Sequence, residues 1–392
     1  MIAPARRGSV PRRPRARFAR WLRVSLLLVT IPLGLSGCAS SRSGPPAGGA
    51  LELVPVGRYD FEAQPTGNPA LLAEELSGIT WIGGEQYLTI GDDHASVHQL
   101  TIHLDSQTGR VVDAQFRTPL RLADPSGAVI PDSLGSDREG IAFIPLSHEV
   151  WISNEHTDGD QSRSSLARHR LRDGRTLELV RTDGTSMLRV FSRQRLNGGF
   201  ESLARSPDGS AYWTANEMPL SIDGEPATDS TGGVVRLQRL DGQMRPVAQY
   251  PYPIDPYFAK IQSPPQLAGF AVSGLSELLA LPGGNLLGLE RSFAGDSTGA
   301  ANLRVRLYEI VLAGATDVGA LGWAEGLKGR PYVPVRKRLL WEQNFGLTTS
   351  NFEGMTLGPT LENGDRALIL IADNNGGRSQ ALYVLRIRGI GI

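Results

Sequence analysis

A short motif recurs five times along this chain, and its regular spacing limits what the chain can fold into. The copies begin at positions 77, 139, 201, 277 and 353, so successive spacings are 62, 62, 76 and 76 residues. They read Ser77-Gly-Ile-Thr-Trp81, Glu139-Gly-Ile-Ala-Phe143, Glu201-Ser-Leu-Ala-Arg205, Glu277-Leu-Leu-Ala-Leu281 and Glu353-Gly-Met-Thr-Leu357. A unit of this size, repeated in register, is typical of a fold built from identical supersecondary units.

Each of the first four copies predicts four strands separated by turn signals. In the second copy the strands are residues 140–144, 149–154, 166–171 and 176–181, with Asp173-Gly174 in the last turn. The fifth copy has three strands before the chain ends. The apolar segment 51–61 has no partner of its own, so we expect it to supply the missing outer strand and close a ring.

The sequence therefore predicts an all-β fold, a β-propeller of five four-stranded blades that residues 51–392 form. Six blades remain an alternative if residues 118–135 or 250–274 contain a degenerate blade, and a β-sandwich is a second alternative. Residues 317–329 are an insertion in the fourth repeat, with a short helix as one option.

The N-terminal region has the three parts of a secretory signal. Residues 1–37 carry eight arginines, all up to Arg23, and no acidic residue, and the apolar run Val24–Leu35 that follows Arg23 is too short to span a membrane. The sequence Leu35-Ser-Gly-Cys38 resembles a bacterial lipobox, which implies cleavage before Cys38 and lipidation of its sulfur. Ala39 then favours the outer membrane. A plain secretory signal is the alternative. Residues 38–50 read as a flexible tether.

The formal net charge of the full sequence is zero, but the expected mature chain is acidic. Removing the eight arginines of residues 1–37 leaves 32 basic residues against 40 acidic ones. An acidic chain without a basic cluster is a poor candidate for binding nucleic acid. Cys38 is the only cysteine, so its lipidation would leave no thiol for catalysis or disulfides. We expect a monomer that contacts the membrane through its lipid.

Acidic and amide residues also follow the second strand of each repeat. Adjacent antiparallel strands return to the same face, and the first strand of every propeller blade lines the central channel, so these residues should converge with the motif glutamates. Oxygen ligands without cysteine favour Ca²⁺ over zinc. The candidate Ca²⁺ ligands are Glu139, Glu201, Glu277, Glu353, Asp93, Glu155, Glu217, Glu290 and Asp373. The alternative is that each glutamate caps backbone amides where blades meet.

Three cationic or titratable residues stand at equivalent strand ends and are candidate catalytic groups. His94 and His156 each follow a carboxylate, so either is a candidate general acid. Arg291 is a candidate phosphate clamp, with a salt bridge to a neighbouring glutamate as the alternative. Ser297 lies in a Gly-x-Ser-x-Gly pattern, but a strand follows within a few residues instead of the required helix, which argues against a serine nucleophile.

The combined pattern resembles the bacterial phytase-like family, described by an esterase-like activity of phytase. The resemblance runs from about residue 70 to 388, and the matching stretches are Glu75-Leu-Ser-Gly-Ile79, Asp137-Arg-Glu-Gly-Ile141, Gly199-Phe-Glu-Ser-Leu203, Gly274-Leu-Ser-Glu-Leu278 and Asn351-Phe-Glu-Gly-Met355. It implies a propeller and hydrolysis of a small phosphoester or ester. The alternatives are a non-catalytic binding or scaffold lipoprotein and a calcium-centred lactone or carboxylic-ester hydrolase. Ser77 stands where the other four copies of the motif have glutamate.

Overall fold

The structure is a computed structural model that describes ten stretches of the chain. These are residues 50–62, 73–92, 94–132, 137–156, 163–183, 186–257, 272–295, 301–346, 351–374 and 379–389. They belong to one compact unit, Pro45–Ile392, and the other unit, Met1–Gly44, lies outside the described residues. The expected signal segment, Cys38 and nearly all of the expected tether are therefore not described.

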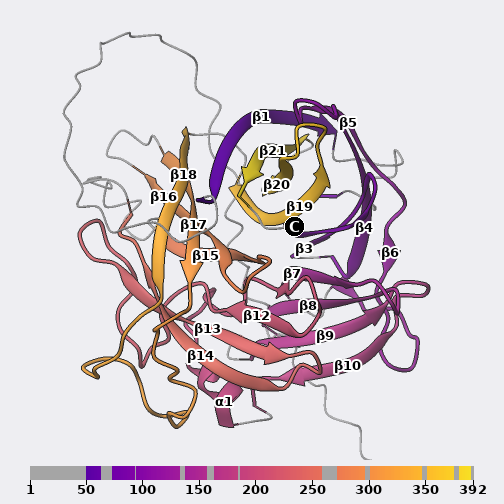
Figure 1. Ribbon diagram of the computed structural model, residues 1–392. Coiled ribbons are helices and arrows are strands. Elements are labelled where there is room, and N and C mark those ends of the chain that lie inside the picture. Colours follow the sequence, from indigo (N-terminus) through magenta and orange to yellow (C-terminus); the bar gives the residue numbers. More distant parts are fainter. Residues whose placement is uncertain are drawn as a thin grey trace, which may run out of the picture. The chain divides into compact units, whose positions relative to one another are not determined.

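Five antiparallel sheets form the blades of a β-propeller (Figure 1). Blade 1 contains β2 (Leu76–Gly83), β3 (Gln86–Gly91), β4 (Ser96–Leu104) and β5 (Val111–Phe116), and the short β6 (Leu120–Arg121) also pairs with β4. Blade 2 contains β7 (Asp137–Ile144), β8 (Glu149–His156), β9 (Ser165–Arg170) and β10 (Thr176–Arg181). Blade 3 contains β11 (Ala204–Arg205), β12 (Ala211–Ala215), β13 (Gly233–Asp241) and β14 (Pro246–Ile254).

Blade 5 confirms the predicted closure of the ring. Blade 4 contains β15 (Val272–Ala280), β16 (Leu286–Gly295), β17 (Ala301–Val311) and β18 (Arg336–Gly346). Blade 5 contains β19 (Asn351–Thr360), β20 (Arg366–Asp373), β21 (Ser379–Arg388) and, as its outer strand, β1 (Glu52–Glu62). The β1–β21 ladder runs from Glu52 opposite Arg388 to Glu62 opposite Ser379. Five blades are thus confirmed, and the described residues contain no sixth.

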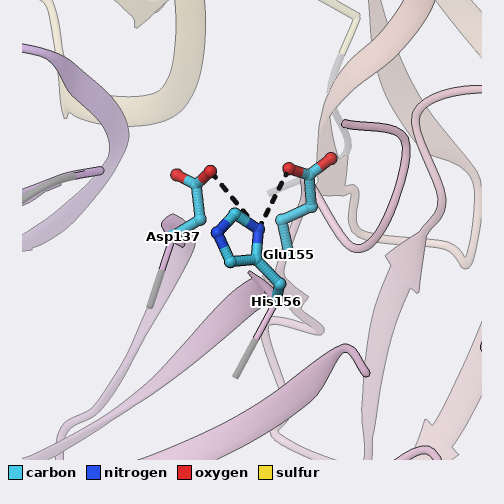
Figure 2. A group of neighbouring side chains, drawn as sticks. All are labelled: Asp137, Glu155 and His156. Carbon is cyan, nitrogen blue, oxygen red and sulfur yellow. Dashed lines mark ion pairs between the residues drawn. The ribbon is translucent and has the colours of Figure 1, made fainter. Parts of the chain in front are cut away.

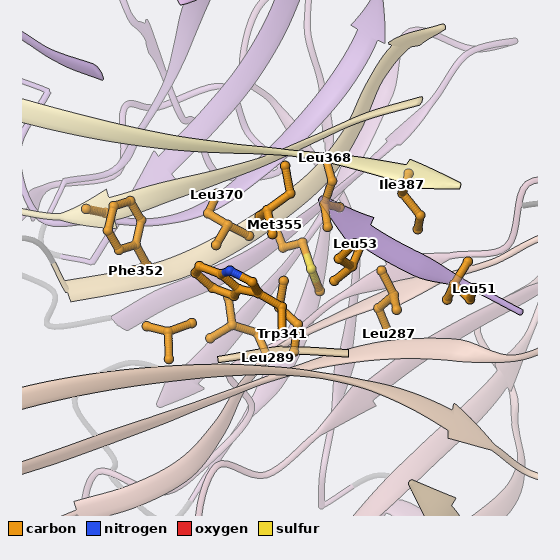
Figure 3. Packing of buried hydrophobic residues seen from close by; sticks show 14 of the residues in the cluster. Leu51, Leu53, Leu287, Leu289, Trp341, Phe352, Met355, Leu368, Leu370 and Ile387 are labelled. Carbon is orange, nitrogen blue, oxygen red and sulfur yellow. The ribbon is translucent and has the colours of Figure 1, made fainter. Parts of the chain in front are cut away.

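The hydrophobic core is divided into five clusters, one between each pair of neighbouring blades. Alternating strand residues face opposite sides of a blade, so each blade packs against both neighbours. Figure 3 shows the cluster between blades 4 and 5, where Leu53 of β1 packs near Trp341, Met355 and Leu368. Burying a leucine of this kind contributes about 1.5–3 kcal/mol, which makes β1 part of the core as well as of the sheet.

The insertion in blade 4 is not helical. Within the described residues the one α-helix is α1 (Ser186–Arg189), which the 3₁₀ turn η3 (Val190–Arg193) follows. The insertion is held by a buried ion pair between Arg236 and Asp223, because Arg236 also donates to the Glu325 carbonyl and Asp223 accepts from the Leu327 amide. The expectation of a short helix over 317–329 was wrong, and the Glu325 carbonyl and Leu327 amide bond to the Arg236–Asp223 pair in place of helical partners.

Among the described residues, none of the helices is long and apolar enough to cross a membrane.

Candidate functional site: an acidic cluster at the inner strands

A β-bulge near the start of the inner strand positions the motif side chains. The ladder between the first and second strands shifts between Leu76 and Gly78 in blade 1, and between Phe352 and Gly354 in blade 5. Ser77 and Glu353 are therefore the extra residues of their bulges. A bulge re-aims a side chain out of the regular alternation, and bulges are common beside functional sites.

Blade 4 has a different register from the one that the sequence repeats suggested. Its shift falls between Leu275 and Glu277, so Ser276 is the bulge residue that corresponds to Glu353. Glu277 lies one position further along the strand. Because side chains alternate along a strand, a one-residue offset turns the side chain toward different neighbours. The equivalence of Glu277 with Glu353 was therefore wrong.

Eight carboxylates from blades 1, 2, 3 and 5 lie near one another at the ends of the first and second strands. We call them the acidic cluster: Asp92, Asp137, Glu139, Glu155, Glu201, Glu217, Glu353 and Asp373. Within it, three groups have ligand atoms within 4.8 Å of one another: Asp137 with Glu155 and His156, Asp92 with Asp137 and Glu139, and Glu139 with Glu155 and Glu201. The expected convergence of first-strand and second-strand acids is thus present.

Burial and mutual repulsion disfavour ionisation of the cluster. Burial raises the pKa of Glu139 well above its usual range, and Glu201 and Asp92 raise it further. Burial likewise raises the pKa of Glu201, with Glu217 and Glu155 adding to the effect. Burial raises the pKa of Glu353 to about 8, although Arg291 opposes the shift. Carboxylates this close cannot all stay ionised unless cations bind among them. Without cations, some of them must be protonated.

Two members of the cluster, Asp92 and Asp137, were not among the candidates chosen from the sequence. Asp92 accepts a hydrogen bond from Ser77, and burial raises its pKa, helped by Asp137. In blade 1 the neighbouring Asp93 was chosen instead, and it lies outside the described residues. Asp137 opens one of the stretches that carry the family resemblance. The strand pairing that identifies them, with Asp137 opposite His156, is a property of the fold.

His156 lies between two carboxylates of the cluster, whereas His94 lies apart. In Figure 2 the Nδ1 atom of His156 faces Asp137 and Glu155, at 3.5 Å from an oxygen of each. His94 is 3.8 Å from Glu74 and from Asp132, neither of which belongs to the cluster. Of the two histidines proposed from the sequence, His156 is therefore the one that the fold brings to the acids.

Arg291 forms the salt bridges that the sequence analysis gave as its alternative role. Its Nη2 atom donates to Glu217 at 2.6 Å, and its Nη1 atom donates to Glu353. Burial opposes the charge on Arg291, but Glu353, Glu217 and Glu201 outweigh this effect and raise its pKa. Arg291 thus connects blade 4 to acids of blades 3 and 5.

Glu277 matches the alternative in which a glutamate caps backbone amides. Its Oε1 atom accepts hydrogen bonds from the amides of Leu203 at 3.2 Å and Leu278 at 2.9 Å, and the Met355 amide also interacts with it. Burial raises its pKa to about 8, and none of the clustered acids contributes to the shift. Glu277 therefore joins blades 3, 4 and 5 and stands apart from the acidic cluster.

Glu290 also lies apart from the cluster. It is fully buried and accepts hydrogen bonds from the Tyr252 hydroxyl at 2.7 Å and from Lys337 at 2.5 Å. Burial raises its pKa, with Lys337 opposing the shift. Lys337 also contacts Asp255 at 2.7 Å. These contacts satisfy Glu290 between blades 3 and 4, and the next residue of the strand, Arg291, is the one that reaches the acids.

The donor set of the cluster suits a hard divalent cation. It offers carboxylate oxygens from several blades, which are the ligands that Ca²⁺ prefers, with one imidazole beside them. Adjacent groups share ligands, since Asp137, Glu139 and Glu155 each belong to two of the three. A cation here would also offset the repulsion that raises the pKa values. The residues therefore fit the expected metal, and the fit is best on blades 1 to 3.

One of the described cavities lies away from the cluster. It has a volume of about 290 Å³ and is lined by Pro282, Asn363, Asp365, Arg366 and Arg388, among others. Arg366 begins β20, and Asp373 of the cluster ends it, so the cavity is at the opposite end of the blade. It contains no member of the acidic cluster, and the chemistry of the cluster gives it the stronger claim to function.

Solved structures of other proteins resemble this chain only distantly. A PQQ-bound aldose sugar dehydrogenase from Streptomyces coelicolor is 15% identical, with a TM-score of 0.38 over 86% of this chain and 100% of that one. An α-L-arabinofuranosidase from Podospora anserina is 10% identical, with a TM-score of 0.39 over 86% and 99%. A gluconolactonase from Xanthomonas campestris is 9% identical, with a TM-score of 0.33 over 86% and 90%.

No curated protein matches the chain. A family model does match, and it covers residues 73–376, from just before the first inner strand to just beyond the last acid of the cluster. The match includes four complete blades and the inner half of the fifth. The chain therefore belongs to the phytase-like family that is described by the esterase-like activity of phytase.

Proposed function

We propose that this protein is a metal-dependent hydrolase of phosphoric esters whose acidic cluster holds Ca²⁺. The observation that carries the proposal is the set of three overlapping ligand groups on blades 1 to 3. Membership of the phytase-like family supports hydrolysis as the reaction class. The ions would be held by the carboxylates of Asp92, Asp137, Glu139, Glu155 and Glu201.

More than one ion is needed for a phosphorylated substrate. The cluster is strongly acidic, so a phosphate group would be repelled from it until cations reversed the local field. Groups that share ligands allow ions to sit close together. When bound, such ions polarise a phosphoryl oxygen and lower the pKa of water.

His156 is the candidate proton donor. Its Nδ1 atom lies between Asp137 and Glu155, which hold the ring in place. An imidazole at the edge of a carboxylate site is suited to protonating the leaving alkoxide. Arg291 is already engaged by Glu217 and Glu353, so in this proposal it supplies positive charge and is not a free phosphate clamp.

The test is an assay of the purified full-length protein on p-nitrophenyl phosphate, phytate, p-nitrophenyl acetate and a lactone, with Ca²⁺ and with a chelator. We expect phosphatase turnover that the chelator abolishes. Glu201→Gln should lower kcat/KM by about 100-fold, while Glu178→Gln, an exposed acid on β10, should leave it unchanged. Turnover confined to the acetate or lactone would overturn the phosphoric-ester assignment. Absence of turnover on all substrates would favour a binding protein.

We also propose that Cys38 carries a lipid that anchors the protein at the outer membrane through the tether of residues 38–50. The lipobox-like sequence before Cys38 supports this proposal. Cys38→Ala should shift the protein from the membrane fraction to the soluble fraction and abolish labelling by a palmitate analogue. Unchanged fractionation of the variant would contradict a lipid anchor.

A further inference from the structure

We infer that Arg291 is a built-in counter-ion that confines metal ions to the blade 1–3 side of the acidic cluster. This inference rests on the proposed metal site, and it assigns Arg291 a role in deciding where, and how many, cations bind. It also separates the carboxylates that serve as ligands from those that hold the arginine.

Arg291 is bound by two acids of the cluster on neighbouring blades. Its guanidinium donates to Glu217 of blade 3 at 2.6 Å and to Glu353 of blade 5. The arginine side chain is 14% exposed and the two acids are 2% and 10% exposed, so water screens these contacts weakly. Without Arg291, Glu217 and Glu353 would be two buried carboxylates facing one shared space.

Blade 4 is modified at three positions that make room for this arrangement. Gly274 pairs with Arg291 across the ladder, and a Cβ atom on Gly274 would lie 2.4 Å from Cγ of Glu217. Ser276 stands at the bulge where blade 5 has Glu353. Arg291 itself stands where blade 5 has Asp373, because Gly274 and Asn351 occupy equivalent positions in their ladders. Blade 4 thus supplies a cation where its neighbour supplies carboxylates.

The possible ligand groups avoid the acids that Arg291 engages. Among the residues that the structure describes, all three groups come from blades 1 to 3, and none includes Glu217 or Glu353. A guanidinium keeps its charge at every physiological pH, so Arg291 cannot release Glu217 and Glu353 by losing a proton. Its positive charge also repels a divalent cation at short range, most strongly where the site is buried.

The test counts bound Ca²⁺ by calorimetry and by elemental analysis of the full-length protein after gel filtration. Arg291→Gln keeps a similar length but removes the charge. We expect it to bind one more Ca²⁺ than the wild type, and to bind the others roughly fivefold or more tightly. Arg291→Lys, the matched control, keeps the charge and should bind the wild-type number. Adding Glu217→Gln and Glu353→Gln to Arg291→Gln should remove the extra ion.

A second pair of variants keeps the inference testable if Arg291→Gln does not fold. Glu217→Gln combined with Glu353→Gln, with Arg291 intact, should bind the wild-type number of Ca²⁺, because these acids are not ligands. Loss of an ion in this variant, or no gain in a folded Arg291→Gln, would overturn the inference. If the wild type binds no Ca²⁺, the proposed function fails. A gain in Arg291→Gln that depends on Glu217 and Glu353 would still support the counter-ion role.

Discussion

The glutamates of the repeated motif have different roles, although they begin equivalent copies of the motif in the sequence. Glu139 and Glu201 belong to groups of possible metal ligands, and Glu353 binds Arg291. Glu277 accepts hydrogen bonds from backbone amides, including that of Leu203 in the neighbouring blade. The distinction comes from one-residue differences in register, and from the residue that each neighbouring blade presents. A repeated acid is therefore evidence of a repeated position before it is evidence of a repeated role.

Replacing Glu277 should affect stability and not metal binding. Glu277→Ala would leave the buried amides of Leu203 and Leu278 without their acceptor, at a cost of about 1–3 kcal/mol for each amide. We expect a melting temperature several degrees lower and an unchanged Ca²⁺ affinity, measured by calorimetry. Glu178→Ala on the exposed face of β10 is the control. A loss of bound Ca²⁺ in a folded Glu277→Ala protein would show that Glu277 is a ligand.

The raised pKa values predict that the calcium-free protein becomes less stable as the pH rises. Glu277, which has no cationic partner among the described residues, titrates near 4.5 when unfolded and at about 8 in the fold. The folded state then holds protons that the unfolded state releases, so this contribution is complete below about pH 4.5 and is lost as the pH passes 8. Between pH 5.5 and 8.5 the melting temperature should fall by roughly 5 °C.

Saturating Ca²⁺ should remove the part of this pH dependence that comes from the raised pKa values of Glu139 and Glu201, because an ion stabilises their ionised form and binds only the folded state, and it should leave the part that comes from Glu277. The measurement is a series of thermal melts at both calcium levels. A calcium-free protein that gains stability between pH 5.5 and 8.5 would contradict the assignment of buried, protonated acids.

At the scale of strands and blades, close packing of the inner strands explains the glycines of the motif. A Cβ atom on Gly78 would lie 2.3 Å from the Glu139 carbonyl oxygen, and one on Gly140 would lie 2.3 Å from the Leu203 amide nitrogen. Neighbouring inner strands therefore touch through their backbones beneath the acids. This contact fixes the spacing between the carboxylates of adjacent blades.

Adding a methyl group at this contact should separate the blades. Gly140→Ala is expected to cost about 1–3 kcal/mol, as overpacking of a rigid backbone does, and to weaken Ca²⁺ binding as well. Gly322→Ala is the matched control, because the nearest atom there is the end of the exposed Glu325 side chain at 3.0 Å. Denaturant unfolding and calcium titration measure the two effects. Equal stability of both variants would argue against direct backbone contact at Gly140.

Much of the architecture could be predicted because strand periodicity and turn residues are local properties. The five blades and the role of β1 follow from such signals. The membership of the cluster was harder to predict. Asp92 and Asp137 were missed, and Glu277 and Glu290 were grouped with acids that they do not join, because bulges and ladder register depend on the partner strand. Arg291 illustrates the same limit, since its two partners come from other blades.

At the scale of the whole propeller, the ring depends on a strand from the opposite end of the chain. Ten residues of β1 pair with β21, and Leu51 and Leu53 enter the core between blades 4 and 5. Removing this strand would expose the edge of β21 and part of that core. Exposed edges of this kind promote aggregation.

Deleting residues 50–62 should therefore yield a protein that aggregates or melts at a much lower temperature. Light scattering and circular dichroism measure the two outcomes. The control replaces Arg58 and Asp60, an exposed pair on the same strand, with serine and should remain monomeric and stable. A deletion variant with wild-type stability would show that β1 adds little to the ring.

The pairing of Glu52 with Arg388 also determines when the ring can close during synthesis. The ribosome makes β1 before the other strands of the propeller and β21 after them, so β1 must wait, unpaired, until the rest of the propeller has been synthesised. Such long-range closure is slow relative to local pairing. A translation product that ends before β21 cannot close the ring, however many complete blades it contains. The ring therefore closes only after every strand of the propeller has been made, so an unclosed β21 edge marks each copy whose propeller is unfinished.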